Sequence, residues 1–424
     1  MKQLENNRVV VVGFEIATAL GYGLDKTWKR AVAGESGIDW VSRVDVKGYP
    51  CQAVGEIPDL DYDGYDFLTK REQSNWFSKF IPLSMMLSND ALKHAKLNIT
   101  EELSYRTGVI IGSALPGLDA YEKTLNLLED GNYNKVSPFL LPNLCSNLSC
   151  GKSSILLNLK GPQFAVGGAC ATGNHAIALG SRLIQSGEAD IILAGGVEMP
   201  ILEPIIYGFG NMNTMIKRSD KDRAYNSPDL SSRPYSLDRN GFVLSEGGSV
   251  LVLTSLDIAL ERELEIYGEI LGIGMTGDAK HFTAPYDKSI VKCIDQALDD
   301  AEINTDDISY INGHGTSTKT GDKIEITSLT KVFGDKLYEI PISSNKSQLG
   351  HSLGATAAVE AVLSLYGMRE NTILPTINYL EDPEFSGINF VPDKSIEMKQ
   401  SYVLSNSFGF GGTNCCVIFG KYSQ

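Results

Sequence analysis

The feature that most constrains the fold of this chain is an alternation of short apolar runs with helical patterns. Val- and Ile-rich runs cover residues 8–13, 107–112, 190–195 and 249–254, and a second set covers 266–273, 308–311, 340–344, 402–404 and 415–419. Helical spacing is seen at residues 82–95, 176–185, 290–301, 324–332 and 355–368. Strands that alternate with amphipathic helices are typical of layered α/β proteins, and continuously apolar strands indicate a sheet covered on both faces. We therefore predict an α/β fold with a mainly parallel sheet.

The order of these elements is similar in the two halves of the chain. Each half has a strand, helices, a strand near a Gly-rich turn, another helix and closing strands. We predict a duplicated architecture, with an N-terminal domain at residues 1–255 and a C-terminal domain at residues 256–424. The most irregular region, residues 211–239, lacks helix and strand periodicity and is long for a loop, which suggests function or short unrecognised elements.

Composition narrows the classes of function. The 424 residues include 37 Lys and Arg against 52 Asp and Glu, for a net charge of −15, which argues against general binding to nucleic acid or to an anionic membrane. No stretch approaches the roughly 18 uninterrupted apolar residues of a membrane span. The seven cysteines are scattered and form no CxxC pair. We therefore predict a reducing, cytoplasmic location.

One cysteine lies at a turn between a predicted strand and a predicted helix. Residues 163–166 have the pattern of a strand, residues 167–169 are all small, and helical spacing follows Cys170. Free amide groups and the dipole at a helix start favour an anion, so we expect this placement to lower the thiol pKa and to make Cys170 a nucleophile. On this pattern alone, a packed small hydrophobe is an equally good interpretation.

Two histidines and a lysine lie in Gly-rich turns that follow apolar strands. His314 stands in NGHGTSTKTGD, and Lys346 and His351 stand in NKSQLGH. Loops at the carboxyl ends of strands are the usual place for sites in open α/β sheets. Neither HExxH nor CxxC is present, so we predict no metal.

A third Gly-rich segment, NSFGFGGTN at residues 406–414, precedes the last apolar run. It is too rich in Gly for a helix. Its backbone N–H groups suit a developing oxyanion, and a plain tight turn is the alternative. A phosphate loop is not favoured, because no GK[ST] and no following helix are present.

Taken together, GACATG, NGHGTSTKTGD, NKSQLGH and NSFGFGGTN, in this order and spacing, resemble the elongating β-ketoacyl-acyl-carrier-protein synthases, close to synthase II. The resemblance covers nearly the whole chain. It implies the thiolase fold, in which two similar halves form a five-layer αβαβα dimer. It also implies decarboxylative condensation of a malonyl carrier thioester with a cysteine-bound acyl chain, in fatty acid or polyketide synthesis.

The resemblance implies a role for each matching residue. Cys170 matches the nucleophile, His314 and His351 the pair that assists decarboxylation, and Lys346 the lysine that organises the site electrostatically. Glu360 matches an acid that supports the residues in contact with the substrate. Thr316 and Thr318 match hydroxyls that hold the phosphopantetheine arm. The backbone N–H groups of Cys170 and Phe410 match the oxyanion hole, and the ring of Phe410 matches the gate of the site. No cofactor is bound permanently, since substrates arrive on the 4'-phosphopantetheine of an acyl carrier protein.

The resemblance also implies partners. These are an acyl carrier protein and a second subunit, either an identical copy or a chain-length subunit. Lys70 and Arg71 match a carrier-docking patch, and we expect Lys217 and Arg218 to assist them; a solvated basic face is the alternative. The chain departs from the family pattern at Ser236, usually Asp, at Ser245, usually Gly, and in a longer segment around residues 217–232. We expect these changes to affect docking or the pocket mouth more than the chemistry, and to favour a specialised polyene or polyketide synthase.

Two alternatives differ in class. A non-catalytic chain-length subunit shares the fold but typically lacks the nucleophile, whereas Cys170 and both histidines are present here. A thiolase would need a second active-site cysteine near the C-terminus, and Cys415 or Cys416 would have to supply it. Their place at the start of a predicted strand favours packing instead.

Overall fold

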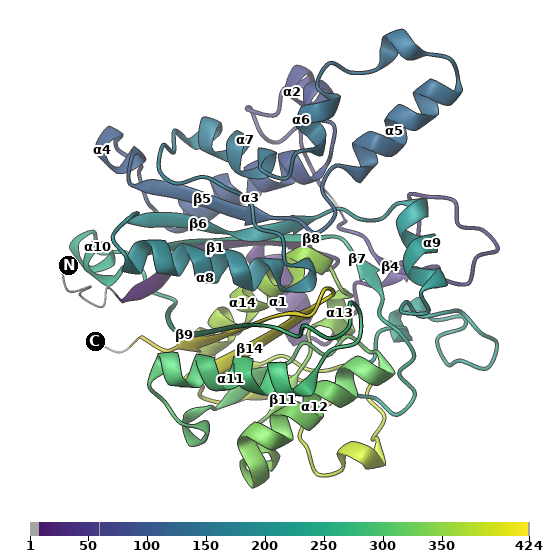
Figure 1. Ribbon diagram of the computed structural model, residues 1–424, viewed down its shortest axis with the longest axis vertical. Coiled ribbons are helices and arrows are strands. Elements are labelled where there is room, and N and C mark those ends of the chain that lie inside the picture. The colour runs from purple at the N-terminus through teal and green to yellow at the C-terminus, as the bar shows by residue number, and fades with distance from the viewer. Residues whose placement is uncertain (1–7, 59, 423–424) are drawn as a thin grey trace.

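A computed structural model describes residues 8–58 and 60–422 of the chain, and its centre is a ten-stranded sheet (Figure 1). The strands of this sheet are β1 (Val9–Thr18), β2 (Gly21–Tyr22), β5 (Thr107–Gly112), β6 (Ile191–Glu198), β8 (Gly247–Ser255), β9 (Gly268–Gly277), β10 (Tyr310–Asn312), β11 (Ile342–Ser343), β14 (Tyr402–Gly409) and β15 (Thr413–Gly420). They pair in the order β11-β10-β14-β15-β9-β1-β8-β6-β5, and β2 pairs with β1.

The prediction of a mainly parallel sheet is wrong, because the sheet is mixed. Parallel pairing joins β5 to β6 and β10 to both β11 and β14. Antiparallel pairing joins β8 to β1 and β6, and β15 to β9 and β14. The antiparallel strands β8 and β15 are buried along nearly their whole length, and their centres are continuously apolar, so their composition does not distinguish them from parallel strands.

The strand order is repeated across the molecule. The parallel pair β5 and β6 is followed by β8 and then β1, and the parallel pair β14 and β10 is followed by β15 and then β9. The two sets meet where β1 pairs with β9 at Val9 and Ile270. The predicted α/β class and duplication are therefore confirmed. The domain boundary after residue 255 stays a prediction, and it would fall between β8 and helix α10 (Leu256–Glu261).

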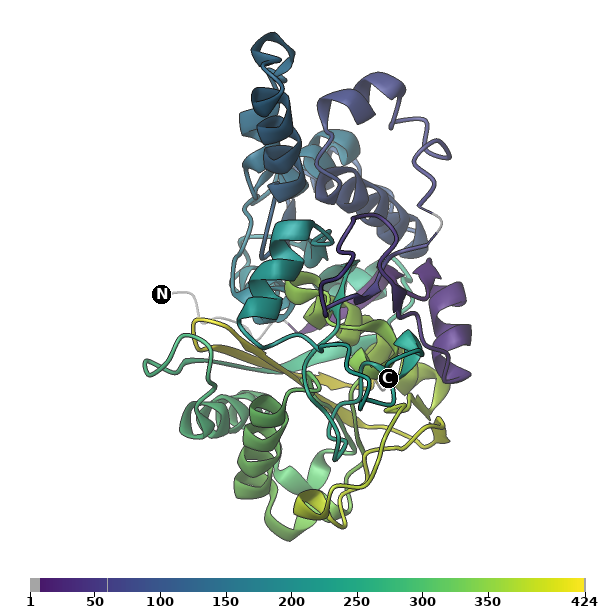
Figure 2. The same cartoon turned by 90° about the vertical axis from the view of Figure 1, so that its right-hand side faces the viewer.

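Helices form three layers around the two sets of strands (Figure 1). The outer layers contain α3 (Phe80–His94) and α7 (Leu148–Leu157) on one side, and α11 (Asp287–Ala301) and α12 (Lys319–Phe333) on the other. The middle layer contains α8 (Thr172–Gln185) and α14 (Leu353–Glu370). The predicted five-layer arrangement is thus confirmed. Helix α5 (Leu118–Glu129) projects beyond the layers (Figure 2).

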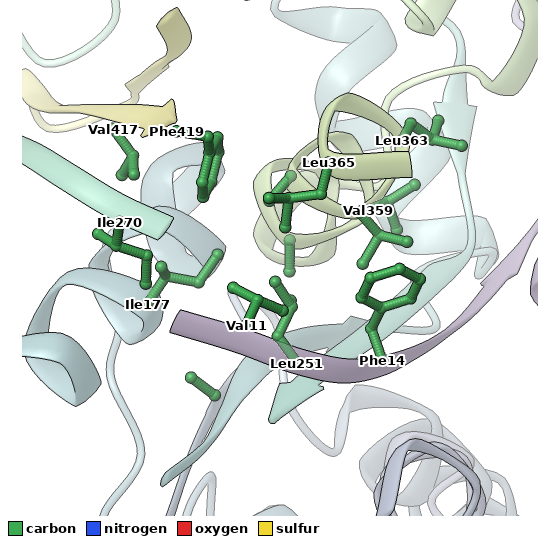
Figure 3. Close-up of a cluster of buried hydrophobic side chains, with 14 of the residues drawn as sticks. Val11, Phe14, Ile177, Leu251, Ile270, Val359, Leu363, Leu365, Val417 and Phe419 are labelled. Atoms are coloured by element: carbon green, nitrogen blue, oxygen red, sulfur yellow. The ribbon is translucent and has the colours of Figure 1, made fainter. Parts of the chain in front are cut away.

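The middle layer is held by apolar contacts on both faces. Figure 3 shows Ile177 of α8 and Val359 of α14 lying among side chains of both strand sets, including Leu251 and Phe419. Helix α14 is apolar nearly all round, as expected of a fully buried helix. The two helices approach closely at Gly173, where a Cβ atom would lie 2.4 Å from the backbone nitrogen of Ala358.

Shorter elements complete the chain. They are α1 (Leu24–Val32), α2 (Lys70–Asn75), α4 (Glu101–Ser104), α6 (Leu140–Leu144), α9 (Glu203–Asn211), α13 (Lys346–Leu349), β3 (Asp39–Trp40), β4 (Ala53–Gly55), β7 (Leu244–Ser245), β12 (Thr372–Ile373) and β13 (Ile396–Glu397). After α9, residues 212–243 are irregular apart from one 3-10 turn, Pro228–Leu230, as the sequence indicates. No helix among the described residues is long and apolar enough to cross a membrane.

Candidate active site

Cys170 lies in a 3-10 turn, Ala169–Ala171, immediately before α8. The strand predicted at residues 163–166 is wrong, because only Gln163 pairs with β5, through a single bridge to Val109. The small residues of the turn permit close packing. A Cβ atom on Gly168 would lie 2.4 Å from Nδ1 of His175, and one on Gly409 would lie 2.7 Å from the carbonyl oxygen of Gly168. The cysteine loop and the C-terminal glycine loop are therefore in direct contact.

His351 is the immediate partner of the cysteine. Its Nε2 atom lies 3.0 Å from Sγ of Cys170, and its Nδ1 atom lies 2.9 Å from Oγ1 of Thr356, one turn into α14. The Thr356 hydroxyl can donate to Nδ1 or accept from it, so it orients the ring in either tautomer. The sequence analysis missed Thr356, because His351 precedes the helix and no helical spacing links the two residues.

His314 completes the group from the loop after β10. Its ring centroid lies 5.6 Å from that of His351, and the rings are nearly perpendicular. The ligand atoms of Cys170, His314 and His351 all lie within 4.8 Å of one another. Residues that the sequence separates by up to 181 positions therefore share one small volume.

A buried carboxylate holds the His314 loop. Glu325 of α12 accepts hydrogen bonds from the backbone N–H groups of His314 (2.7 Å) and Gly315 (2.8 Å), and from the hydroxyl of Tyr235 (3.0 Å). The sequence analysis missed Glu325, because an acid within a helical pattern is usually solvent-exposed.

A second missed carboxylate ties together loops from both halves. Glu198, at the end of β6, accepts from the backbone N–H groups of Ala114 (2.7 Å), Leu115 (3.0 Å) and Gly354 (3.0 Å), and from Oγ of Ser113 (2.8 Å). An acid that ends an otherwise apolar strand was the available signal for it.

Lys346 forms a buried ion pair beside the histidines. Its Nζ atom lies 2.6 Å from Oε1 of Glu360, and both side chains are 2 % exposed. Burial raises the pKa of Glu360 to about 7, while Lys346 acts in the opposite direction. This pair brings the lysine at the start of α13 against the acid of α14 that was predicted to support the site.

The electrostatics keep both imidazoles neutral. Burial lowers the pKa of His314 well below its ordinary value, and the positive charge of Lys346 lowers it further. Burial and Lys346 likewise lower the pKa of His351. Neutral histidines offer one donor and one acceptor nitrogen each.

The expectation that the helix start lowers the thiol pKa of Cys170 is wrong. Burial raises this pKa to about 12, although Lys346 and the backbone N–H of Phe410 favour the thiolate. Desolvation therefore outweighs the local charges and amides. The cysteine rests as a thiol that shares a hydrogen bond with His351, so its proton must leave as it attacks.

The remaining predicted residues lie around this centre or at the surface. Phe410 is half-buried and packs near Phe209, with ring centroids 6.2 Å apart. Thr316 and Thr318 are half-buried, and their hydroxyl oxygens lie 3.0 Å apart. Thr318 also caps α12 by accepting from the N–H of Gly321.

The four basic residues predicted for docking are engaged to different degrees. Lys70 pairs with Asp63 at 2.7 Å, and Arg71 is exposed. Lys217 donates to Asn213, while the guanidinium of Arg218 lies over two aromatic rings, those of Trp40 (4.8 Å) and Tyr225 (4.5 Å).

Two of the three departures from the family pattern, Ser236 and Ser245, have defined contacts. Oγ of Ser236 bonds to Asp238 and accepts from the N–H of Leu380, within the irregular segment. Ser245 lies nearer to the chemistry than expected, because its N–H donates to the carbonyl of His351 at 3.0 Å. Its hydroxyl lies 3.0 Å from the carbonyl oxygen of Gly55, so it fastens the strand beside His351 to β4.

Cys415 and Cys416 are buried in β15 on opposite faces of the sheet, within two different apolar clusters. Burial raises the pKa of both thiols well above the ordinary value. This packing favours a structural role for both cysteines, as the sequence indicates.

Comparison with known proteins places this arrangement in a class. The chain superposes on "The ishigamide ketosynthase/chain length factor" with a TM-score of 0.88 and 30 % identity, covering 99 % of this chain and 100 % of that one. It superposes on a type II PKS acyl-carrier protein in complex with its ketosynthase, AntDE:AntF, with a TM-score of 0.89 and 25 % identity over 99 % and 100 % of the two chains. The fold is therefore that of the thiolase-fold ketosynthases.

Sequence comparison defines the family. The N-terminal domain of β-ketoacyl synthase matches residues 6–259, and the C-terminal domain matches residues 267–380. The 3-oxoacyl-[acyl-carrier-protein] synthase 2 of Coxiella burnetii (strain RSA 493 / Nine Mile phase I) is 37 % identical over 420 residues, 99 % of each chain. The chain belongs to the β-ketoacyl synthase family and is an acyltransferase of the ketosynthase kind.

Proposed function

We propose that the protein elongates an acyl chain held on an acyl carrier protein, by condensing it with a malonyl carrier thioester and releasing carbon dioxide. The observation that carries this proposal is the 3.0 Å contact between Sγ of Cys170 and Nε2 of His351, with the His314 ring beside them. This contact pairs a thiol with a neutral imidazole that can take its proton.

In the first step, the sulfur of Cys170 attacks the carbonyl carbon of the acyl thioester while Nε2 of His351 takes the thiol proton. The N–H groups of Cys170 and Phe410 stabilise the oxyanion. The carbon–sulfur bond to the carrier then breaks, and the departing pantetheine thiolate takes the proton back from His351. The acyl chain is left on Cys170 as a thioester.

In the second step, the bond between the malonyl carboxylate and its neighbouring carbon breaks, and carbon dioxide leaves. The electron pair forms an enolate, whose oxygen accepts one hydrogen bond from an N–H of His314 and one from His351. For this step His351 carries its proton on Nε2, and the Thr356 hydroxyl donates to Nδ1. The enolate carbon attacks the Cys170 thioester and expels the sulfur as a thiolate. This thiolate takes the proton from Nε2 of His351, and Nδ1 regains a proton from the solvent, so that the resting thiol and imidazole are restored. Lys346 keeps both imidazoles neutral, so that each has one N–H to donate.

We place the phosphopantetheine arm beside Thr316 and Thr318, and the gate at Phe410. The carrier docks on a surface that includes Lys70 and Arg71, with Lys217 and Arg218 near the irregular segment. We further propose that the enzyme works as a cytoplasmic dimer, and that it requires no permanently bound cofactor.

The proposal is tested with purified protein, an acyl carrier thioester and malonyl carrier protein. We expect a 3-ketoacyl carrier product and one carbon dioxide per condensation. Absence of this product over a panel of acyl chain lengths, with a carrier that another synthase accepts, would contradict the proposal.

A specialised polyketide or polyene pathway is the second candidate. It is favoured by the likeness to the ishigamide ketosynthase/chain length factor and by the irregular segment at residues 212–243. Mass spectrometry of the products from saturated and polyunsaturated primers separates the two. Preferential extension of saturated primers would assign the enzyme to fatty acid synthesis.

A further inference from the structure

The three side chains at the centre of the site also form a set of ligands for a soft metal ion. Within the described residues, the ligand atoms of Cys170, His314 and His351 lie within 4.8 Å of one another, and all three side chains are buried. Zinc binds Cys sulfur at about 2.3 Å and His nitrogen at about 2.0–2.1 Å, so tetrahedral ligand atoms lie roughly 3.3–3.6 Å apart. Small side-chain movements therefore suffice to close the set around one ion.

We propose that Cys170, His314 and His351 form a reversible inhibitory site for a soft divalent cation, of which Zn²⁺ is the prototype. One thiolate and two imidazoles make three protein ligands, and the fourth position is left for water. The bound ion occupies the sulfur that attacks the acyl thioester. Metal binding and acyl transfer are therefore mutually exclusive.

The surroundings of His351 match those of a metal-binding histidine. Such a ring usually donates its other N–H to a fixed acceptor, which sets the tautomer and aims the free nitrogen. Nδ1 of His351 lies 2.9 Å from Oγ1 of Thr356, and Thr356 is itself 3.1 Å from Oγ of Ser352. The unprotonated Nε2 atom is then directed at the cysteine sulfur.

His314 supplies an independent observation. The side chain is 8 % exposed, and its Nδ1 atom is buried without a hydrogen-bond partner among the described residues. Its loop is fixed by Glu325 through two backbone N–H groups, so the ring is held in place without using its own nitrogens.

The charge of Lys346 acts against a cation at the cluster, as it does against protonation of the two histidines. The carboxylate of Glu360, 2.6 Å from Nζ of Lys346, partly offsets it. The Cys170 thiol must release one proton to the solvent when the metal–sulfur bond forms.

The test uses the purified protein, freed of adventitious metal by a chelator, and titrates it with Co²⁺ as a coloured substitute for Zn²⁺. We expect one Co²⁺ per chain and an absorption band from thiolate-to-cobalt charge transfer. Zn²⁺ should remove the band. Cys170→Ala should abolish it, and His314→Ala should weaken binding by at least about tenfold. Cys145→Ala is the matched control, because Cys145 is exposed and should leave the titration unchanged.

A second measurement does not depend on the variants folding. In the unsubstituted protein, Zn²⁺ should slow alkylation of Cys170 by iodoacetamide, measured on its peptide by mass spectrometry, and leave alkylation of Cys145 unchanged. The proposal is overturned if no thiolate band forms, if the band survives Cys170→Ala, or if Zn²⁺ leaves the alkylation of Cys170 unaffected. Neither readout uses a carrier substrate, so failure of the proposed condensation would not alter these outcomes.

Discussion

The helices α8 and α14 occupy equivalent places in the two halves, yet they equip the site in different ways. Each lies in the middle layer, and the next strand of the central sheet along the chain is in a parallel pair, β6 with β5 after α8 and β14 with β10 after α14. The turn before α8 contributes one sulfur among small residues, whereas the segment before α14 contributes Lys346 and His351. At the site, the N-terminal half therefore contributes close backbone packing, and the C-terminal half contributes buried polar and charged side chains.

The largest expected effect separates the chemistry of the two halves. Cys170→Ala should reduce chain extension by more than about a thousandfold, because no other group can carry the acyl chain. The same variant should still decarboxylate malonyl carrier protein, since both histidines remain. Extension is measured by product mass and decarboxylation by release of labelled carbon dioxide.

The matched substitution on the other side is His314→Ala, which should reduce both reactions. Equal loss of decarboxylation in the Cys170 and His314 variants would contradict this division of labour.

Next in size is the effect of the lysine on pH dependence. Lys346 lowers the pKa of both histidines, so Lys346→Met should raise both values and move the acidic limb of the rate profile to higher pH. At neutral pH we expect the rate of chain extension to fall by about a hundredfold or more. Because Glu360 is left buried without its partner, the free energy of unfolding should also fall, by about 3–5 kcal/mol. An acidic limb that stays in place would show that Lys346 acts by another route.

A steric change tests the packing of the Cys170 turn, in the N-terminal half, against the C-terminal glycine loop. Gly409→Ala would place a Cβ atom 2.7 Å from the carbonyl oxygen of Gly168 and 3.1 Å from the nitrogen of Cys170. We expect a loss of about 1–3 kcal/mol in the free energy of unfolding and a slower acylation of Cys170. Gly411→Ala is the control, because it is the same substitution at a position where a Cβ atom meets nothing within 4 Å. Any loss of stability in that variant is due to the positive φ of 84° at Gly411.

The smallest expected effect concerns the orientation of His351. Thr356→Val keeps the shape of the side chain and removes the hydroxyl 2.9 Å from Nδ1. A hydrogen bond of this kind contributes about 0.5–1.5 kcal/mol, which corresponds to a rate loss of roughly tenfold or less. The loss should appear in kcat rather than in KM for the carrier. A change confined to KM would show that Thr356 contacts substrate instead.

Much of the fold and of the site could be predicted from the sequence. The helices of the middle layer were recognisable from their long apolar patterns, and the motifs around Cys170, His314 and His351 were distinctive. The strands β8 and β15 were predicted at residues 249–254 and 415–419, but their antiparallel direction was not, because burial on both faces removes the alternation that usually identifies antiparallel strands.

Two features of the site depended on tertiary contacts. Glu198 and Glu325 acquire their roles only when distant loops deliver N–H groups to them. The pKa of Cys170 depends on how completely the thiol is removed from water, which a local pattern does not show. The helix start was identified correctly, but the balance between its dipole and burial was decided by the surrounding fold.

The central claim is that Cys170 carries the growing chain between two carrier-bound substrates, and intact-protein mass spectrometry tests it most directly. Incubation with an acyl carrier thioester should add one acyl mass, mapped to the peptide that contains Cys170. Addition of malonyl carrier protein should remove that mass and yield the 3-ketoacyl product. An acyl mass on another residue, or one on Cys170 that malonyl carrier protein cannot discharge, would contradict the account.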